Sequence, residues 1–168
     1  MPRAHVIGLL GGSFNPAHRG HRRITLFAMA ALGLDCAWWL VSPGNPLKAG
    51  GDMASLKARL RSAERLSRRA PIVPTAIELE FDTRYTADTL RKLMRRYPKH
   101  RFVWLMGADN LAQFHLWRGW RRIARTIPIA VIARPGYDAA AMSSPAMAWL
   151  RRYRMPAASF RKRGQWSV

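Results

Sequence analysis

Two kinds of segment alternate along this chain: continuously apolar runs, and stretches whose apolar residues recur every three or four positions. Continuous runs of this length are typical of parallel strands that helices cover on both faces. The stretches between them have the spacing of amphipathic helices. The pattern therefore predicts five strands, at residues 5–10, 36–42, 72–80, 101–107 and 128–134.

Three of the intervening segments have strong helical periodicity. We expect helices over 19–33, which ends at Gly33, over 54–69, and over 86–97, which stops before Pro98. Weaker helical patterns follow at 109–125 and 144–154. The inward positions that the spacing predicts are Ile24, Phe27, Ala28, Ala31 and Leu32 in the first helix, Leu56, Leu60, Ala63 and Leu66 in the second, and Leu90, Leu93, Met94 and Tyr97 in the third. The basic residues of the second helix are expected to face outward: Lys57, Arg59, Arg61, Arg65 and Arg68.

This alternation predicts an α/β fold of the Rossmann-like, doubly wound type. Right-handed crossovers place helices on both faces of a mainly parallel sheet of five strands or slightly more. Ligands of such sheets bind beyond the carboxyl ends of the strands, where the strand order reverses. The chain has 168 residues and no repeat or linker, so residues 1–168 are expected to form a single domain.

Composition narrows the classes of partner. The formal net charge is +20, from 29 Lys and Arg against 9 Asp and Glu. Three interpretations stay open: solvated arginine-rich helix faces, a charge tuned to nucleotide substrates, and nucleic-acid binding, which lacks a supporting pattern of base-stacking aromatics. Cys36 is the only cysteine, so no internal disulfide can form. Neither a long apolar span nor a signal peptide is evident, so we expect a cytoplasmic protein that does not cross a membrane; no pattern specifies its oligomeric state.

The most informative motif follows the first apolar run and reads Gly-Gly-Ser-Phe-Asn-Pro-Ala-His-Arg-Gly-His, residues 11–21. Glycines allow a sharp turn and close approach of a ligand. His18 and His21 then share one side of the first turn of a helix, where free N–H groups and the helix dipole attract phosphate. Imidazole N–H groups can stabilise the charge on a phosphoryl group during transfer. The alternative is that both histidines only cap the helix or fill the core.

Several other phosphate and nucleophile motifs are excluded. The sequence contains no Walker-type G-x-x-x-x-G-K-[ST], no G-x-G-x-x-G and no G-x-S-x-G nucleophile elbow. A zinc site would need more than His18 and His21, and no third ligand lies nearby in the sequence, so no protein-bound metal is expected. Direct in-line displacement is the favoured chemistry because nothing resembles an activated nucleophile.

Five ordered motifs resemble those of the H-x-G-H nucleotidyltransferases, and most closely the bacterial nicotinate-mononucleotide adenylyltransferases. The first is the histidine motif itself; His18 argues against the pantetheine-phosphate branch, which usually lacks the first histidine. The other four are Pro-Gly-Asn-Pro-Leu-Lys at 43–48, Tyr-Thr-Ala-Asp-Thr-Leu at 85–90, Gly-Ala-Asp at 107–109 with Trp117 following, and Arg-Pro-Gly at 134–136. The resemblance covers about residues 5–137.

The resemblance implies a transfer of AMP from ATP to nicotinate mononucleotide, which yields nicotinate adenine dinucleotide and pyrophosphate in NAD biosynthesis. Mg²⁺ would accompany the ATP. His18 and His21 would be catalytic and would contact the ATP phosphates, with Gly11, Gly12, Ser13, Phe14, Asp109 and Arg134 also binding ATP. The residues implied for the mononucleotide are Asn45, Lys48, Thr86 and Trp117, the last by stacking on the pyridine ring.

Each of these residues also has a structural interpretation. The structural alternative for Trp117 is that it is one more core tryptophan among seven, and for Thr86 and Asp109 that they only cap helices. The structural alternative for Lys48 is a solvated charge, and for Arg134 a role only in the turn that contains Pro135 and Gly136.

The C-terminal part departs from the family pattern. The family carries a Ser-x-Thr-x-x-Arg motif there, which the last residues of this sequence, Ser159 to Val168, do not match; Ser143 and Ser144 are no substitute. The expectation is therefore a domain that is shortened relative to the family. Two alternatives to the full activity follow: a nucleotide-binding remnant with weak or no turnover, and a nucleotidyltransferase that acts on another phosphorylated substrate.

Overall fold

The strands form one parallel sheet, in the order β3-β2-β1-β4-β5. The computed structural model of the chain describes residues 4–44, 52–133, 135–136 and 138–164. Within these ranges the expected α/β, Rossmann-like architecture is confirmed. The strands are β1 (Val6–Gly12), β2 (Cys36–Val41), β3 (Ile72–Thr75), β4 (Arg101–Gly107) and β5 (Ile129–Ile132).

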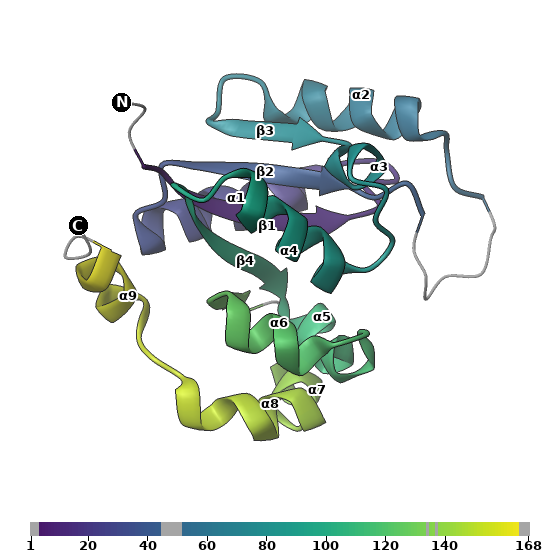
Figure 1. Ribbon diagram of the computed structural model, residues 1–168. Coiled ribbons are helices and arrows are strands. Elements are labelled where there is room, and N and C mark those ends of the chain that lie inside the picture. The colour runs from purple at the N-terminus through teal and green to yellow at the C-terminus, as the bar shows by residue number, and fades with distance from the viewer. Residues whose placement is uncertain (1–3, 45–51, 134, 137, 165–168) are drawn as a thin grey trace.

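Helices cover both faces of the sheet (Figure 1). One apolar core lies between the sheet and α4, α5, α6 and α8, and a second lies between the sheet and α1 and α2. The helices are α1 (Arg19–Leu32), α2 (Leu56–Ser67), α3 (Ile77–Glu80), α4 (Thr86–Arg96), α5 (Ala108–Gln113), α6 (Trp120–Thr126), α7 (Asp138–Met142), α8 (Pro145–Leu150) and α9 (Ala157–Gly164), with 3₁₀ turns η1 (Phe114–Leu116) and η2 (Arg151–Tyr153). None of the helices in the described ranges has the length and apolarity that crossing a bilayer requires.

The strand order places the switch point between β1 and β4. The chain builds β1, β2 and β3 outward in one direction and then returns to the other side of β1 with β4. The loops that follow β1 and β4 therefore separate at the carboxyl edge of the sheet, which is where ligands of this architecture bind. The histidine motif follows β1 directly, so the fold places it at this edge.

The expected strand over 72–80 is correct only for its first half. β3 ends at Thr75, and residues 77–80 form the short helix α3. β3 is an edge strand that pairs with β2 alone, and its pairing ends at the Leu40–Thr75 pair; Pro74, which has no N–H group, is tolerated in such an edge strand. The last apolar residues of the expected strand belong to this helix, where Ile77 is 4% exposed and Leu79 is 62% exposed.

Helix α1 has the expected length and ends at Gly33, but its inner face is rotated from the expected one. Phe27 was expected inside and is 65% exposed, whereas Thr25 is fully buried. Burial of Thr25 is possible because its hydroxyl donates to the carbonyl of His21 at 2.7 Å and accepts from the indole N–H of Trp39 at 2.9 Å. A satisfied polar side chain can occupy a core position that periodicity assigns to an apolar one.

The weakly predicted helices are broken into shorter pieces. The segment 109–125 forms α5, η1 and α6, interrupted at Trp117–Gly119, where Gly119 has a φ of 67°. Only glycine adopts that left-handed conformation at little cost, so the sequence itself allows the break. The segment 144–154 forms α8 and η2, and the Ser144 hydroxyl caps α8 by accepting from the N–H of Met147 at 3.1 Å.

Candidate functional site

His18 and His21 lie on one side of the first turn of helix α1, as the sequence predicted, and their rings are in contact at an interplanar angle of 35°. Their ring centroids are 3.9 Å apart. His18 is the N-cap residue and is exposed to solvent, while His21 is half-buried one turn on. The interpretation that both rings fill the core is therefore wrong. The interpretation that they cap the helix is confirmed, and it is compatible with a chemical role.

The capping bonds also determine which nitrogen of each ring carries a proton. Nδ1 of His18 accepts from the N–H of Gly20 at 3.1 Å, and Nδ1 of His21 accepts from the N–H of His18 at 3.1 Å. A neutral imidazole that accepts at Nδ1 carries its hydrogen on Nε2. Each ring in this arrangement has a donor at Nε2, and an array of donors at a helix N-terminus suits an anionic group.

A row of rings in contact connects the histidines to the core. Phe14 is 1% exposed; its ring centroid lies 5.1 Å from that of Trp39 and 4.6 Å from that of His21. The indole of Trp39 is fixed in turn by its bond to Thr25. The position of the His21 ring is therefore set by buried neighbours, which is the pre-organisation that a catalytic donor needs.

The loop between β1 and α1 is attached to the start of α2 by side chains. The Asn15 amide accepts from the N–H of Ala54 at 3.1 Å and donates to the carbonyl of Asp52 at 3.4 Å. The Ser62 hydroxyl accepts from the N–H of Ala17 at 3.0 Å. Loop residues 13–17 consequently have a defined backbone path, although they belong to no helix or strand.

Arg59 contradicts the expectation that the basic residues of this helix face solvent. Its side chain is 2% exposed and donates to the carbonyl oxygens of Ala54, Ser13, Ser42 and Pro43 at 2.9, 2.7, 2.6 and 3.3 Å. Burial lowers the pKa of this guanidinium from its ordinary value. The signal was present in the sequence, because position 59 lies four residues before Ala63 and so on the inner face of α2.

Gly11 is required by packing as well as by any ligand. A Cβ at this position would lie 2.7 Å from Cη2 of Trp104, whose side chain is 2% exposed. Trp104 in turn makes an edge contact with Trp117, with ring centroids 6.1 Å apart. Gly12 differs, since a Cβ there would make an ordinary contact of 3.4 Å with the Phe14 ring. A side chain at position 11 would therefore clash with Trp104, whereas position 12 has room for a methyl group.

Replacing Gly11 with alanine is expected to destabilise the protein by about 1–3 kcal/mol, the usual cost of overpacking a rigid core. The added methyl group must displace the buried indole of Trp104. Gly12→Ala is the matched control and should cost less than about 1 kcal/mol, because its neighbour lies at a normal contact distance. Urea denaturation of both variants measures the difference; equal losses would contradict this account.

The start of α4 and the segment around Trp117 meet at the same edge. The guanidinium of Arg118 lies 4.7 Å from the centre of the Tyr85 ring, and a Cβ at Gly119 would lie 3.6 Å from Cβ of Ala87. The structure thereby brings together the two motifs to which Thr86 and Trp117 belong. Thr86 is the first residue of α4, whose N-cap residue is Tyr85, so the interpretation of Thr86 as a cap is wrong. Trp117 is half-buried against Trp104 and Phe114.

Of the four remaining candidate residues, the structure describes only Asp109. Asp109 follows β4 as the second residue of α5, whose N-cap residue is Gly107, so Asp109 is not the cap of this helix. Its position after β4 is at the switch point. Asn45, Lys48 and Arg134 lie outside the described residues.

Glu78 is a titratable group at this edge that the sequence did not single out. It lies in α3, which follows β3, and its side chain is 8% exposed. Burial raises the pKa of this carboxyl from 4.5 to about 7, and a hydrogen bond with the Ser42 side chain opposes part of that increase. The strand expected over 72–80 gave no indication of this short helix or of the burial of Glu78 in it.

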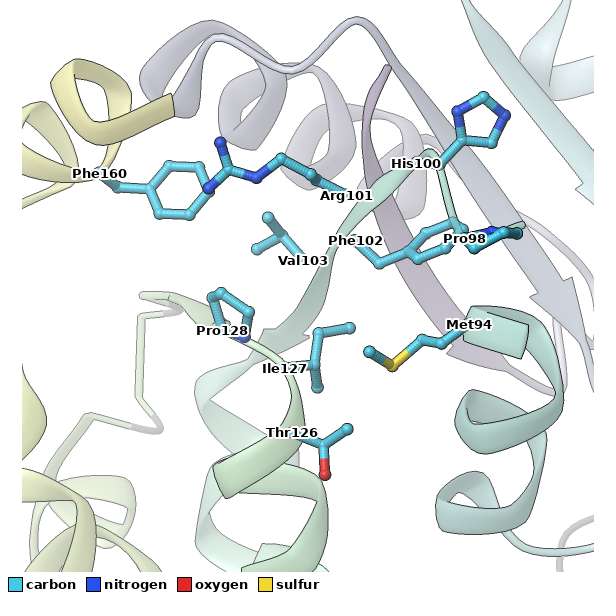
Figure 2. A pocket seen from close by; sticks show the side chains of 10 residues that line it. All are labelled: Met94, Pro98, His100, Arg101, Phe102, Val103, Thr126, Ile127, Pro128 and Phe160. Atoms are coloured by element: carbon cyan, nitrogen blue, oxygen red, sulfur yellow. The ribbon is translucent and has the colours of Figure 1, made fainter. Parts of the chain in front are cut away.

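A cavity at the opposite edge of the sheet contains none of the predicted site residues. Its volume is about 250 Å³, and its lining includes His100, Arg101 and Phe102 at the start of β4, Pro128 just before β5, and Phe160 of α9 (Figure 2). This is the amino edge of the parallel sheet. The cavity therefore lies away from the histidines and from the switch point.

Comparison with known proteins gives one family match and close relatives. The family described as cytidylyltransferase-like matches residues 9–162. A protein of Erythrobacter litoralis named as a probable nicotinate-nucleotide adenylyltransferase is 69% identical over 161 residues, which cover 96% of this chain and 74% of that protein. A protein of the same name from Parvibaculum lavamentivorans is 56% identical over 145 residues, 86% of this chain and 72% of that protein.

Solved structures share the fold at low sequence identity. A Plasmodium falciparum nicotinic acid mononucleotide adenylyltransferase complexed with APC aligns with a TM-score of 0.68 at 15% identity, covering 84% of this chain and 71% of that one. A structure of the Plasmodium enzyme complexed with NaAD aligns with a TM-score of 0.63 at 14% identity, covering 94% and 89%.

Proposed function

We propose that this chain transfers AMP from ATP to nicotinate mononucleotide. The chain belongs to the cytidylyltransferase-like family and within it to the nicotinate-nucleotide adenylyltransferases. Nicotinate adenine dinucleotide and pyrophosphate are the products, and the reaction belongs to NAD biosynthesis, which we place in the cytoplasm. The single observation that carries the chemistry is the pair of adjacent histidine rings at the start of α1, next to the switch point of the sheet.

The reaction needs positioning and charge stabilisation rather than a protein nucleophile. An oxygen of the mononucleotide phosphate attacks the α-phosphorus of ATP, and the bond from that phosphorus to the bridging oxygen of the β-phosphate breaks. The Nε2–H groups of His18 and His21 donate to phosphate oxygens as negative charge shifts toward the leaving pyrophosphate. The backbone of Gly11, Gly12, Ser13 and Phe14 adjoins the ATP, Asp109 binds its ribose, and Arg134 reaches the nucleotide.

Mg²⁺ is proposed to enter with ATP as its counter-ion. Mg²⁺ in nucleotide sites commonly keeps several waters and binds through substrate phosphates with few protein ligands. Groups of three or more metal-ligating side chains are absent from the described residues, which fits a cation held mainly by the triphosphate. When bound, it neutralises phosphate charge; the histidines and the positive end of helix α1 supply the protein's share.

Pyrophosphate release in the presence of ATP and Mg²⁺ tests the substrate assignment. We expect turnover with nicotinate mononucleotide and much weaker turnover with 4′-phosphopantetheine or ribose 5-phosphate. Faster turnover with another phosphorylated compound would replace the acceptor but retain the reaction class. Calorimetric binding of ATP without turnover of any acceptor would identify the chain as a nucleotide-binding remnant.

Trp117 is proposed to stack on the pyridine ring, with Thr86, Asn45 and Lys48 holding the rest of the mononucleotide. Removal of an aromatic stacking partner costs about 1–3 kcal/mol, so Trp117→Ala should raise the KM for the mononucleotide about tenfold or more while leaving that for ATP within about twofold. Trp117→Phe keeps a stacking face and should lose less. Trp149→Phe, in a ring cluster with Trp120 and Tyr153, is the control. Equal increases in both KM values would contradict the assignment.

A further inference from the structure

Arg59 is a buried charge that the reaction described above does not use. Four hydrogen bonds engage its guanidinium, and all four acceptors are backbone carbonyl oxygens. No carboxylate forms an ion pair with it among the described residues. Burying an arginine without a carboxylate partner is expensive, so the contacts that it makes need a reason beyond neutralising its charge.

The four acceptors belong to backbone that converges on the carboxyl edge of the sheet. Ser13 follows β1, Ser42 and Pro43 follow β2, and Ala54 precedes α2. β1 and β2 are neighbours, and the N–H of Ser42 donates to the carbonyl of Gly12 at 2.9 Å. Figure 1 shows α2 beginning at the side of the sheet toward which the strand arrows point. One side chain thus fixes the ends of two adjacent strands relative to each other.

The direction of these carbonyls has an electrostatic consequence. The C=O and N–H groups of a trans peptide point in opposite directions, and the peptide between Ser13 and Phe14 is trans. When the Ser13 carbonyl turns inward to Arg59, the N–H of Phe14 points away from α2; the Pro43 carbonyl directs the N–H of Gly44 in the same manner. Without the guanidinium, these carbonyl oxygens would be free to turn toward the edge, where they would repel an anion.

We propose that Arg59 is a positioning residue for the triphosphate of ATP, because it holds strand-end carbonyls inward and so presents N–H groups and positive potential at the carboxyl edge. This inference rests on the function proposed above and assigns it a further residue. Arg59 does not touch the substrate; it acts through the carbonyls of Ser13 and Pro43, which precede the N–H groups of Phe14 and Gly44. Its bond to the Ser42 carbonyl fixes the end of β2 but presents no N–H group, because the next residue is Pro43. The anchors at Asn15 and Ser62 hold the same loop, so the loop does not depend on Arg59 alone for its attachment.

Arg59→Ala is the test, with Arg61→Ala as its matched control, because Arg61 is exposed on the same helix and its loss changes the net charge equally. Loss of hydrogen bonds to a charged group predicts a KM for ATP that rises about tenfold or more in Arg59→Ala, with the KM for nicotinate mononucleotide within about twofold of the wild type. Ethylguanidinium at millimolar concentration, which replaces the missing group, should restore the KM for ATP in Arg59→Ala and leave Arg61→Ala unaffected. Equal increases in both KM values, or no restoration, would overturn the proposal.

Two further measurements keep this test decisive. If Arg59→Ala does not fold, Arg59→Lys retains the charge with a smaller set of donors and should fold with a raised KM for ATP; an unchanged KM in that variant would also overturn the proposal. If the wild type releases no pyrophosphate, the proposed function fails, and calorimetric binding of ATP still compares Arg59→Ala with Arg61→Ala. Weaker binding in Arg59→Ala alone supports the role of Arg59, and equal binding refutes it.

Discussion

Replacing His18 with serine is expected to lower kcat by about 10²–10³, the usual cost of removing one pre-organised donor from a site of developing charge. The Nδ1 atom of His18 caps α1, and its Nε2–H is the group proposed to face the phosphates. Serine is a good N-cap residue, so it replaces the first role and not the second. The variant should therefore fold with near wild-type stability and bind ATP, yet turn over slowly.

His18→Ala separates the two roles further. It removes the cap as well as the donor, so it should lose the same catalytic factor and, in addition, about 1 kcal/mol of stability. Thermal unfolding and steady-state kinetics on both variants distinguish the contributions. If His18→Ser retained full turnover and His18→Ala lost activity only in proportion to its lost stability, the histidine would be a structural cap and nothing more.

Glu78 is expected to make the protein less stable as the pH rises from about 4.5 to about 7. In the folded protein, burial raises the pKa of this carboxyl to about 7, whereas an exposed carboxyl titrates near 4.5. Between these values the folded state holds a proton that the unfolded chain has released, so folding is progressively disfavoured as the pH increases. Above pH 7 the full difference of about 2.5 pKa units corresponds to about 3 kcal/mol.

Glu78→Gln should remove this dependence because the amide does not ionise. At pH 8 the variant should be more stable than the wild type, by up to about 3 kcal/mol, and the gain should shrink toward pH 4.5. Glu80→Gln is the matched control, since Glu80 lies in the same helix and is exposed. Urea denaturation between pH 4.5 and 8 provides the comparison. A stability difference between Glu78→Gln and wild type that did not change with pH would contradict the assignment of this carboxyl.

The sequence predicted the fold where local signals and tertiary structure agree. The apolar runs at β1, β2 and β4 are continuous because both faces of these strands are buried, and the parallel sheet follows from that pattern. The helix at 19–33 and its end at Gly33 follow from periodicity and cap chemistry. The region after β3 was predicted wrongly, because an apolar run extended to residue 80 does not show that the strand ends at Thr75 and that residues 77–80 form a short helix.

The candidate site was predictable in its residue types but not in how it is supported. A glycine turn with two spaced histidines indicates phosphate chemistry from local sequence alone, and the structure brings the two rings together at the expected edge. Arg59, Thr25 and Glu78 escaped prediction because their burial depends on partners distant in sequence: carbonyls of other loops, the Trp39 indole and the Ser42 hydroxyl. Periodicity places position 59 on the inner face of α2, but polar residue types are assigned to the surface, and only tertiary hydrogen bonds reverse that assignment.

Phosphorus NMR of the reaction mixture shows whether AMP is transferred to the mononucleotide and whether His18 is needed for the transfer. The chain is incubated with ATP, Mg²⁺ and nicotinate mononucleotide, and both phosphorus products are followed over time. We expect pyrophosphate and the diphosphate bridge of a dinucleotide to appear in equal amounts with the wild type. Over the same period, neither product should accumulate in the His18→Ser reaction. Formation of ADP with orthophosphate, or dinucleotide formation at the same rate in His18→Ser, would contradict this expectation.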